Sequence, residues 1–187
     1  MNIDALYCFW ILFGTTLHVS QRTFGLYSLQ HGVDYYAEVH TSFWNSLIHT
    51  IFMPCTMFGM YLWIPALFRM RPYEAKQLRY AVSMAYMFHY VKINAITAYF
   101  VALWYYKPLV YADEMYRRIF NPKESLCLGL AISICALFIQ EVIGHYIGGD
   151  NPSRLEAIPN AMIYAPYYSV SHLVDQFVTC WTMLLKN

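Results

Sequence analysis

The segment that decides the fold is Leu78–Tyr106, with the sequence LRYAVSMAYMFHYVKINAITAYFVALWYY. It is mostly apolar, but its 29 residues exceed the roughly 20 that one membrane-spanning helix needs. Three polar residues, His89, Lys92 and Asn94, interrupt its middle. Such a segment either crosses as one tilted helix or breaks at the polar residues and turns back. The direction of every later element depends on which of these occurs.

Three further segments are long and apolar enough to be predicted as spans. Ser46–Phe68 has no Asp, Glu, Lys or Arg, Leu126–Ile147 has Glu141 as its only charge, and Ile158–Leu185 has only Asp175. Ile3–Val19 is shorter and is expected to lie in the interface or against the bundle. The sequence therefore predicts an all-α, polytopic membrane bundle of about four spans with a short N-terminal helix, forming a single domain over 1–187.

Composition excludes some partners and favours others. Apolar residues make up 59% of the 187 residues, charged residues only 12%, and aromatic residues 19%. Such a composition suits contact with membrane lipids better than an aqueous surface. The 12 Lys and Arg are balanced by 11 Asp and Glu, so there is no basic excess to attract a phosphate backbone. We expect membrane lipids as partners and no nucleic acid.

Histidines are spread over all four apolar segments, as His49, His89, His145 and His172. Ionisable side chains inside a span are costly and are functional candidates by default. Two of the four have a carboxylate on the same helical face, Glu141 with His145 and His172 with Asp175. Histidine with carboxylate in a bundle core is a ligand set for iron or another divalent transition metal.

A polar stretch, His40-Thr-Ser-Phe-Trp-Asn45-Ser-Leu-Ile-His49, precedes the first span. Asn45 and His49 share a face if this stretch is helical, whereas His40 and His49 would point to opposite sides of one continuous helix. The two histidines can meet only if the chain bends between them.

Structural interpretations of the same residues stay open. His18 and His31 fit interfacial hydrogen bonding, and His89 fits a wet or broken stretch beside Lys92. Glu141 with His145 also fits a buried structural pair.

Several of these residues form blocks that resemble a known family. Tyr36-Ala-Glu-Val-His40, Asn45, His49 and Pro54, followed by Gly144-His145 and Ala165-Pro166-Tyr167-Tyr168, resemble the small integral-membrane 2-hydroxy fatty acid dioxygenases of phytosphingosine α-oxidation. The resemblance spans residues 34–175. It implies an Fe(II)-dependent enzyme of the endoplasmic reticulum that uses O2 to shorten a long-chain 2-hydroxy acyl substrate by one carbon.

The resemblance implies that His40, His49 and His145 are iron ligands. We add His172 to the expected metal set, assign Glu141 a catalytic role, and expect Asn45 and Asp175 to support the ligands. The chain departs from the family pattern at two of these positions, because Glu141 stands where the family has Gln and His172 where it has an acidic residue.

Geometry sets a condition on the expected metal site. With four simple alternating spans, His49 and His145 would lie at opposite membrane faces, separated by nearly the thickness of the hydrocarbon core. If Leu78–Tyr106 breaks and turns back, His145 returns to the face of His40 and His49. Either that segment is broken, or the histidines do not share a site.

Two function classes follow. The first is the lipid-directed iron dioxygenase. The second is a non-catalytic accessory subunit derived from that family, packed against other subunits of a larger membrane complex, such as a respiratory complex of the mitochondrial inner membrane. Haem is disfavoured, because no two histidines are placed as a pair of axial ligands.

Overall fold

The computed structural model describes residue 14 and residues 29–119, 121–151 and 158–184. These residues form helices and turns with no strand among them, which confirms the all-α prediction. In chain order the helices are α2 (Leu29–Ala37), α3 (Phe43–Leu67), α4 (Pro72–Val91), α5 (Ala95–Ile119), α6 (Pro122–Phe138), the π-helix η1 (Ile139–Gly144), α7 (His145–Gly148) and α8 (Ile158–Leu184). The expected helix over Ile3–Val19 lies outside the described residues apart from Gly14.

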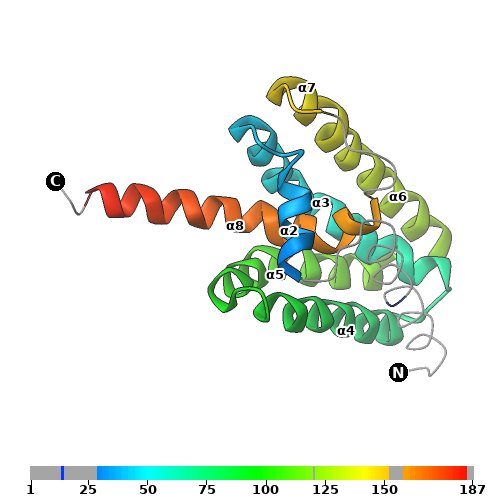
Figure 1. Ribbon diagram of the computed structural model, residues 1–187. Helices are drawn as coiled ribbons and strands as arrows, with labels where there is room; N and C mark the ends of the chain where they lie inside the picture. The colour runs from blue at the N-terminus through cyan, green and yellow to red at the C-terminus, as the bar shows by residue number, and fades with distance from the viewer. Residues whose placement is uncertain (1–13, 15–28, 120, 152–157, 185–187) are drawn as a thin grey trace.

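The long apolar segment Leu78–Tyr106 is broken at its polar residues and turns back. α4 ends at Val91, and α5 begins at Ala95 after the short turn that contains Lys92 and Asn94. The side-chain Oδ1 of Asn94 accepts hydrogen bonds from the backbone N–H groups of Ile96 and Thr97, at 2.9 and 3.1 Å, and so caps the new helix. The chain therefore reverses, and α4 and α5 lie side by side (Figure 1).

Two helices are long and apolar enough to cross a membrane: α3 and the continuous run α6–η1–α7 over Pro122–Gly148. Within their apolar windows only 39% and 22% of the residues are buried, and large side chains such as Trp44, Ile134 and Phe138 are exposed. A core helix of a soluble protein would bury most of its residues. The expected count of about four spans is not confirmed, since two helices of the described chain meet this criterion.

α3 and α6 pack closely along most of their length. A Cβ added to Gly59 would lie 2.6 Å from the carbonyl oxygen of Gly129, and one added to Gly129 would lie 2.7 Å from that of Gly59. Further along, Ser133 and Gln140 hydrogen-bond to Thr56. Residue numbers rise along α3 as they fall along α6, so the helices are antiparallel and joined by small residues.

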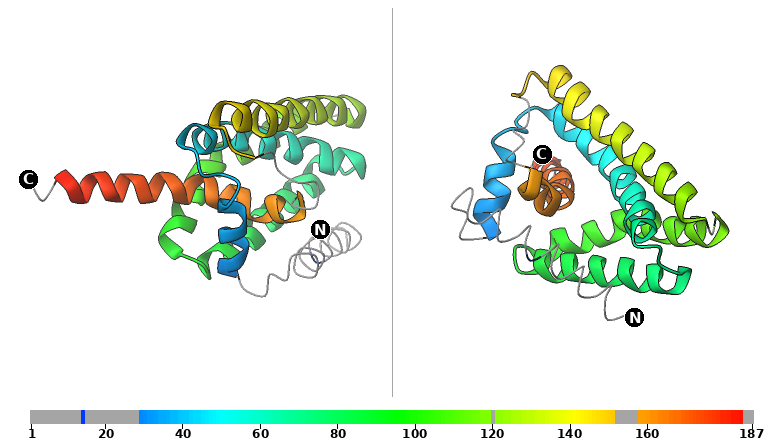
Figure 2. Two further views of the ribbon diagram at one scale, coloured as in Figure 1. Left: turned by 45° about the horizontal axis from the view of Figure 1, so that its top comes forward. Right: turned by 90° about the vertical axis from the view of Figure 1, so that its right-hand side faces the viewer.

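α8 runs through the middle of the molecule. In the end-on view of Figure 2, it lies inside a triangle formed by α2, by α3 with α6, and by α4 with α5. Its first half is buried there, including Ile163, Tyr164 and Tyr167. Its second half projects from the body toward the C-terminus (Figure 1).

Candidate functional site

His40 lies in the turn between α2 and α3, so the chain bends between His40 and His49 as the spacing required. Its Nδ1 is 2.9 Å from the carbonyl oxygen of Tyr36. A carbonyl only accepts, so Nδ1–H donates, and the lone pair of His40 is left on Nε2. The backbone carbonyl of His40 accepts from the hydroxyls of Tyr168 and Ser46. Both the ring and the backbone of His40 are therefore fixed.

His49 projects from the second turn of α3 toward His40. The two Nε2 atoms are 3.3 Å apart, and the hydroxyl of Tyr36 is 3.2 Å from Nδ1 of His49. The Tyr36 ring also stacks on His40, with centroids 4.1 Å apart. One tyrosine thus contacts both imidazoles.

His145 owes its direction to the π-turn that precedes it. The face of α6 toward α3 carries Ser125, Gly129, Ser133 and Ala136, and continues to Gln140. In an uninterrupted α-helix, His145 would lie about 140° around the axis from Gln140. The π-turn over Ile139–Gly144 takes up one residue more than an α-turn and brings His145 back toward α3.

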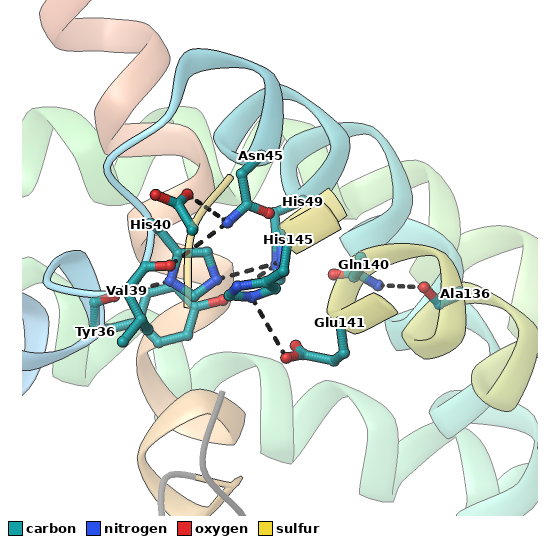
Figure 3. A network of polar contacts seen from close by, with 10 residues as sticks. Tyr36, Val39, His40, Asn45, His49, Ala136, Gln140, Glu141 and His145 are labelled. Carbon is teal, nitrogen blue, oxygen red and sulfur yellow. Dashed lines mark hydrogen bonds and ion pairs between the residues drawn. The ribbon is translucent and has the colours of Figure 1, made fainter. Parts of the chain in front are cut away.

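The three imidazoles converge in a buried cluster (Figure 3). One nitrogen from each of His40, His49 and His145 lies within 4.8 Å of those of the other two, and the side chains are 1%, 1% and 3% exposed. Burial lowers the pKa of His40 to about 4, so this ring is neutral at physiological pH, the form that binds metals. The break between α4 and α5 and this convergence occur together, as the geometrical condition stated.

Glu141 lies beside the cluster, on the π-turn. Its Oε2 is 3.7 Å from Nε2 of His145, and the side chain is about one-third exposed. Oε2 itself is inaccessible to solvent and has no hydrogen-bond partner in the described part of the chain. The carboxylate of Glu141 can therefore orient His145 and remain partly accessible to solvent.

Asn45 packs at the contact between α3 and α7. Its Nδ2 donates to Asp150 at 2.8 Å, and its side chain lies against Gly144 and Gly148, where an added Cβ would come within 2.8 Å of it. The residue therefore sits where the helices carrying His49 and His145 meet, close to the position expected for a supporting residue.

The structure does not bring His172 and Asp175 into the cluster. His172 is half-buried on α8, and the centroid of its ring lies 6.0 Å from that of the Tyr168 ring. Asp175 is exposed. The group of three histidines does not include His172.

The sequence assigned no role at the site to Tyr36, which contacts His40 and His49, or to Asp150, which binds Asn45. Tyr36 could have been noted, because it precedes His40 by four positions, one helical turn. Asp150 gave no local signal, because its partners Thr41, Ser42 and Asn45 lie more than 100 positions earlier in the chain.

The donor set fits a transition metal. Nitrogens bound at about 2.1 Å to one ion lie about 3 to 3.5 Å apart, and the two Nε2 atoms of His40 and His49 meet this condition. Imidazole ligands suit Zn, Cu, Fe and Ni. Three imidazole ligands leave coordination positions of the ion open. Oε2 of Glu141, which has no hydrogen-bond partner in the described part of the chain, lies 3.7 Å from Nε2 of His145 in the same cluster.

Comparisons of the chain with protein-family models, with curated proteins and with solved structures find no match.

Proposed function

We propose that this chain is an integral-membrane, Fe(II)-dependent dioxygenase that acts on long-chain 2-hydroxy fatty acids. The observation that carries the proposal is the convergence of His40, His49 and His145, which come from a turn and two separate helices. The resemblance of the same histidine blocks to the lipid dioxygenases supports iron and the substrate class. The two apolar, largely unburied helices support a membrane location.

The overall reaction balances without an external reductant. The C1–C2 bond of the 2-hydroxy acid breaks, C1 leaves as CO2, and C2 becomes the new carboxyl carbon. The four electrons released reduce one O2, which ends in the new carboxylate and in water. When bound, iron supplies the redox chemistry and the open positions for the hydroxyl and carboxylate oxygens of the substrate.

The chain's own residues hold the site and move protons. For all three rings to offer a lone pair, Nδ1–H of His40 donates to the Tyr36 carbonyl and Nδ1–H of His49 donates to the Tyr36 hydroxyl. The carboxylate of Glu141, which is partly exposed, accepts the proton of the 2-hydroxyl group.

An apolar cavity lies further along the same face of α3. His49, Met53, Met57 and Tyr61 form a buried stripe with a spacing of four residues. Met57 and Tyr61, with Tyr105 of α5, line a cavity of about 210 Å³. This apolar cavity is smaller than the roughly 300 to 1,000 Å³ of typical ligand pockets, so it would hold part of a long acyl tail.

The test is turnover by the purified full chain loaded with Fe(II) in detergent. We expect 2-hydroxyhexadecanoic acid to give the acid shorter by one carbon, with O2 consumed, while hexadecanoic acid gives nothing. His49→Ala and His145→Ala should abolish both iron binding and turnover. His172→Ala should leave them intact if only three histidines bind. Equal turnover by metal-free protein, or no turnover by iron-loaded protein, would contradict the proposal.

The projecting half of α8 favours a second candidate, the accessory subunit. Beyond the body this helix exposes Trp181 and Met183, which a partner subunit in the membrane could cover. Stable co-purification with other membrane subunits, together with no oxygenase activity, would favour this alternative.

A further inference from the structure

Asp150 joins two distant parts of the histidine site. It follows Gly149, whose φ of +70° ends α7 in the left-handed conformation and reverses the chain. The carboxylate then reaches the start of α3. There it accepts hydrogen bonds from the Thr41 hydroxyl at 2.6 Å, from the Ser42 backbone N–H at 3.2 Å and from Asn45 Nδ2 at 2.8 Å.

The carboxylate also supplies a cap that α3 lacks. Ser42 is the N-cap residue of α3, but its own side chain makes no capping hydrogen bond. An anion at a helix N-terminus is stabilised by the free N–H groups and the helix dipole. Burial alone would raise the pKa of Asp150, but the hydrogen bonds from Thr41, Asn45 and the backbone outweigh it and lower the pKa.

Asp150 and two of its donors lie close in sequence to the three histidines. Thr41 follows His40, Asn45 lies one turn before His49, and Asp150 comes five positions after His145. A loss of the carboxylate would release the turn that holds His40 and would loosen Asn45, which packs between Gly144 and Gly148. The separation of the three imidazoles depends on both contacts.

We infer that Asp150 is a positioning residue of the metal site, which ties the segment carrying His40 and His49 to the helix carrying His145. The inference rests on the metal-binding part of the proposed function and not on the substrate.

The experiment is a Co²⁺ titration of the full-length chain in detergent, followed by the visible absorption of the bound ion. Asp150→Asn keeps the size of the side chain but removes its charge and turns an N–H2 group toward Asn45. We expect Co²⁺ binding 10- to 100-fold weaker and an altered absorption spectrum. Asp150→Glu, which keeps the carboxylate, should recover part of the affinity.

Glu74→Gln is the matched control. The carboxylate of Glu74 also accepts three hydrogen bonds, all from Arg71, in front of α4 and at the far end of α3. We expect Glu74→Gln to bind Co²⁺ as the wild type does. Thermal unfolding of each variant, followed by circular dichroism, gives the folded fraction to which the titration is normalised.

The outcomes separate the inference from the proposed function. If the wild type binds Co²⁺ and Asp150→Asn binds it equally well with the same spectrum, Asp150 does not position the site. A wild type that binds no Co²⁺ overturns the metal site itself. Weakened binding in Asp150→Asn, with no turnover of 2-hydroxy acids by the iron-loaded wild type, supports the inference and contradicts the reaction.

Discussion

The hydroxyl of Tyr36 is the hydrogen-bond partner of His49 Nδ1, the ring nitrogen that does not face His40. With His40 Nδ1–H committed to a carbonyl, the hydrogen between the two Nε2 atoms of the metal-free site belongs to His49. The Tyr36 hydroxyl then donates to Nδ1 of His49. For His49 to offer its Nε2 lone pair to a metal, the tautomer would have to reverse, and the same oxygen would then accept from Nδ1–H. Tyr36 can serve both forms, because a hydroxyl both donates and accepts.

Tyr36→Phe tests this role. The variant keeps the ring that stacks on His40 but leaves Nδ1 of His49 without its partner. We expect metal binding weaker by about 10-fold or more, measured by Co²⁺ titration. The control is Tyr116→Phe, which removes a buried hydroxyl that donates to the Met70 carbonyl at 2.8 Å, away from the cluster. Equal affinities in the two variants would refute the role of Tyr36.

The histidine cluster could be anticipated from the sequence only in part. The cost of ionisable groups in apolar segments selects His49 and His145, the family resemblance adds His40, and the structure brings the three together. His172 meets the same criterion but lies on α8 outside the cluster, because helical spacing does not show which face one helix presents to a distant one. Asp150 could not be identified, because its hydrogen bonds connect residues that only the fold makes neighbours.

The π-turn of η1 has no signal in the sequence. Nothing in the composition of Ile139–Gly144 distinguishes it from an ordinary α-helical turn. The break between α4 and α5, in contrast, was predictable, since Lys92 and Asn94 interrupt an apolar segment too long for one span. Polar interruptions can be read from the sequence, but a change of helical pitch results from tertiary packing.

A one-residue deletion distinguishes the π-turn from an α-helix. Removing Val142, which is half exposed, should convert the turn to α-helical geometry and leave His145 facing α3. We expect metal binding to persist within about 10-fold. Removing the exposed Leu130 from regular α6 should rotate all later residues by about 100° and abolish binding. Loss of binding in both deletions would show that the π-turn is not what directs His145.

The close contact of α3 and α6 leaves no room for a side chain at Gly59. A Cβ on Gly59 would lie 2.3 Å from Ser133 Oγ and 2.6 Å from the backbone oxygen of Gly129, and the backbone cannot rotate away. We expect Gly59→Ala to lower the free energy of unfolding by about 1 to 3 kcal/mol. Cys55→Ala, one turn earlier on α3 and exposed, should change it by less than about 0.5 kcal/mol. Denaturant unfolding in detergent measures both, and equal stabilities would contradict close packing.

For the whole molecule, the reversal at Lys92–Asn94 is what allows a shared site. It makes α6 antiparallel to α3, so that His145, near the end of one apolar helix, meets His49, near the start of the other. The sequence predicted this arrangement as a condition of the site. The expected four spans are not confirmed: among the described residues α3 and Pro122–Gly148 are long and apolar enough, and the turn divides Leu78–Tyr106 between α4 and α5. These two helices carry buried charges, among them Arg79 and Asp113.

The charges of Arg79 and Asp113 connect three helices, α4, α5 and α3. Arg79 Nη2 lies 2.9 Å from Asp113 Oδ1, its Nη1 donates to the Tyr61 carbonyl at 3.0 Å, and both charged side chains are buried. Arg79→Met leaves a buried carboxylate without its main partner and should cost about 3 to 5 kcal/mol of unfolding free energy. Arg79→Met with Asp113→Leu should recover most of that loss, because no unpaired charge remains buried. A double variant as unstable as the sum of its single variants would show that the two residues act independently.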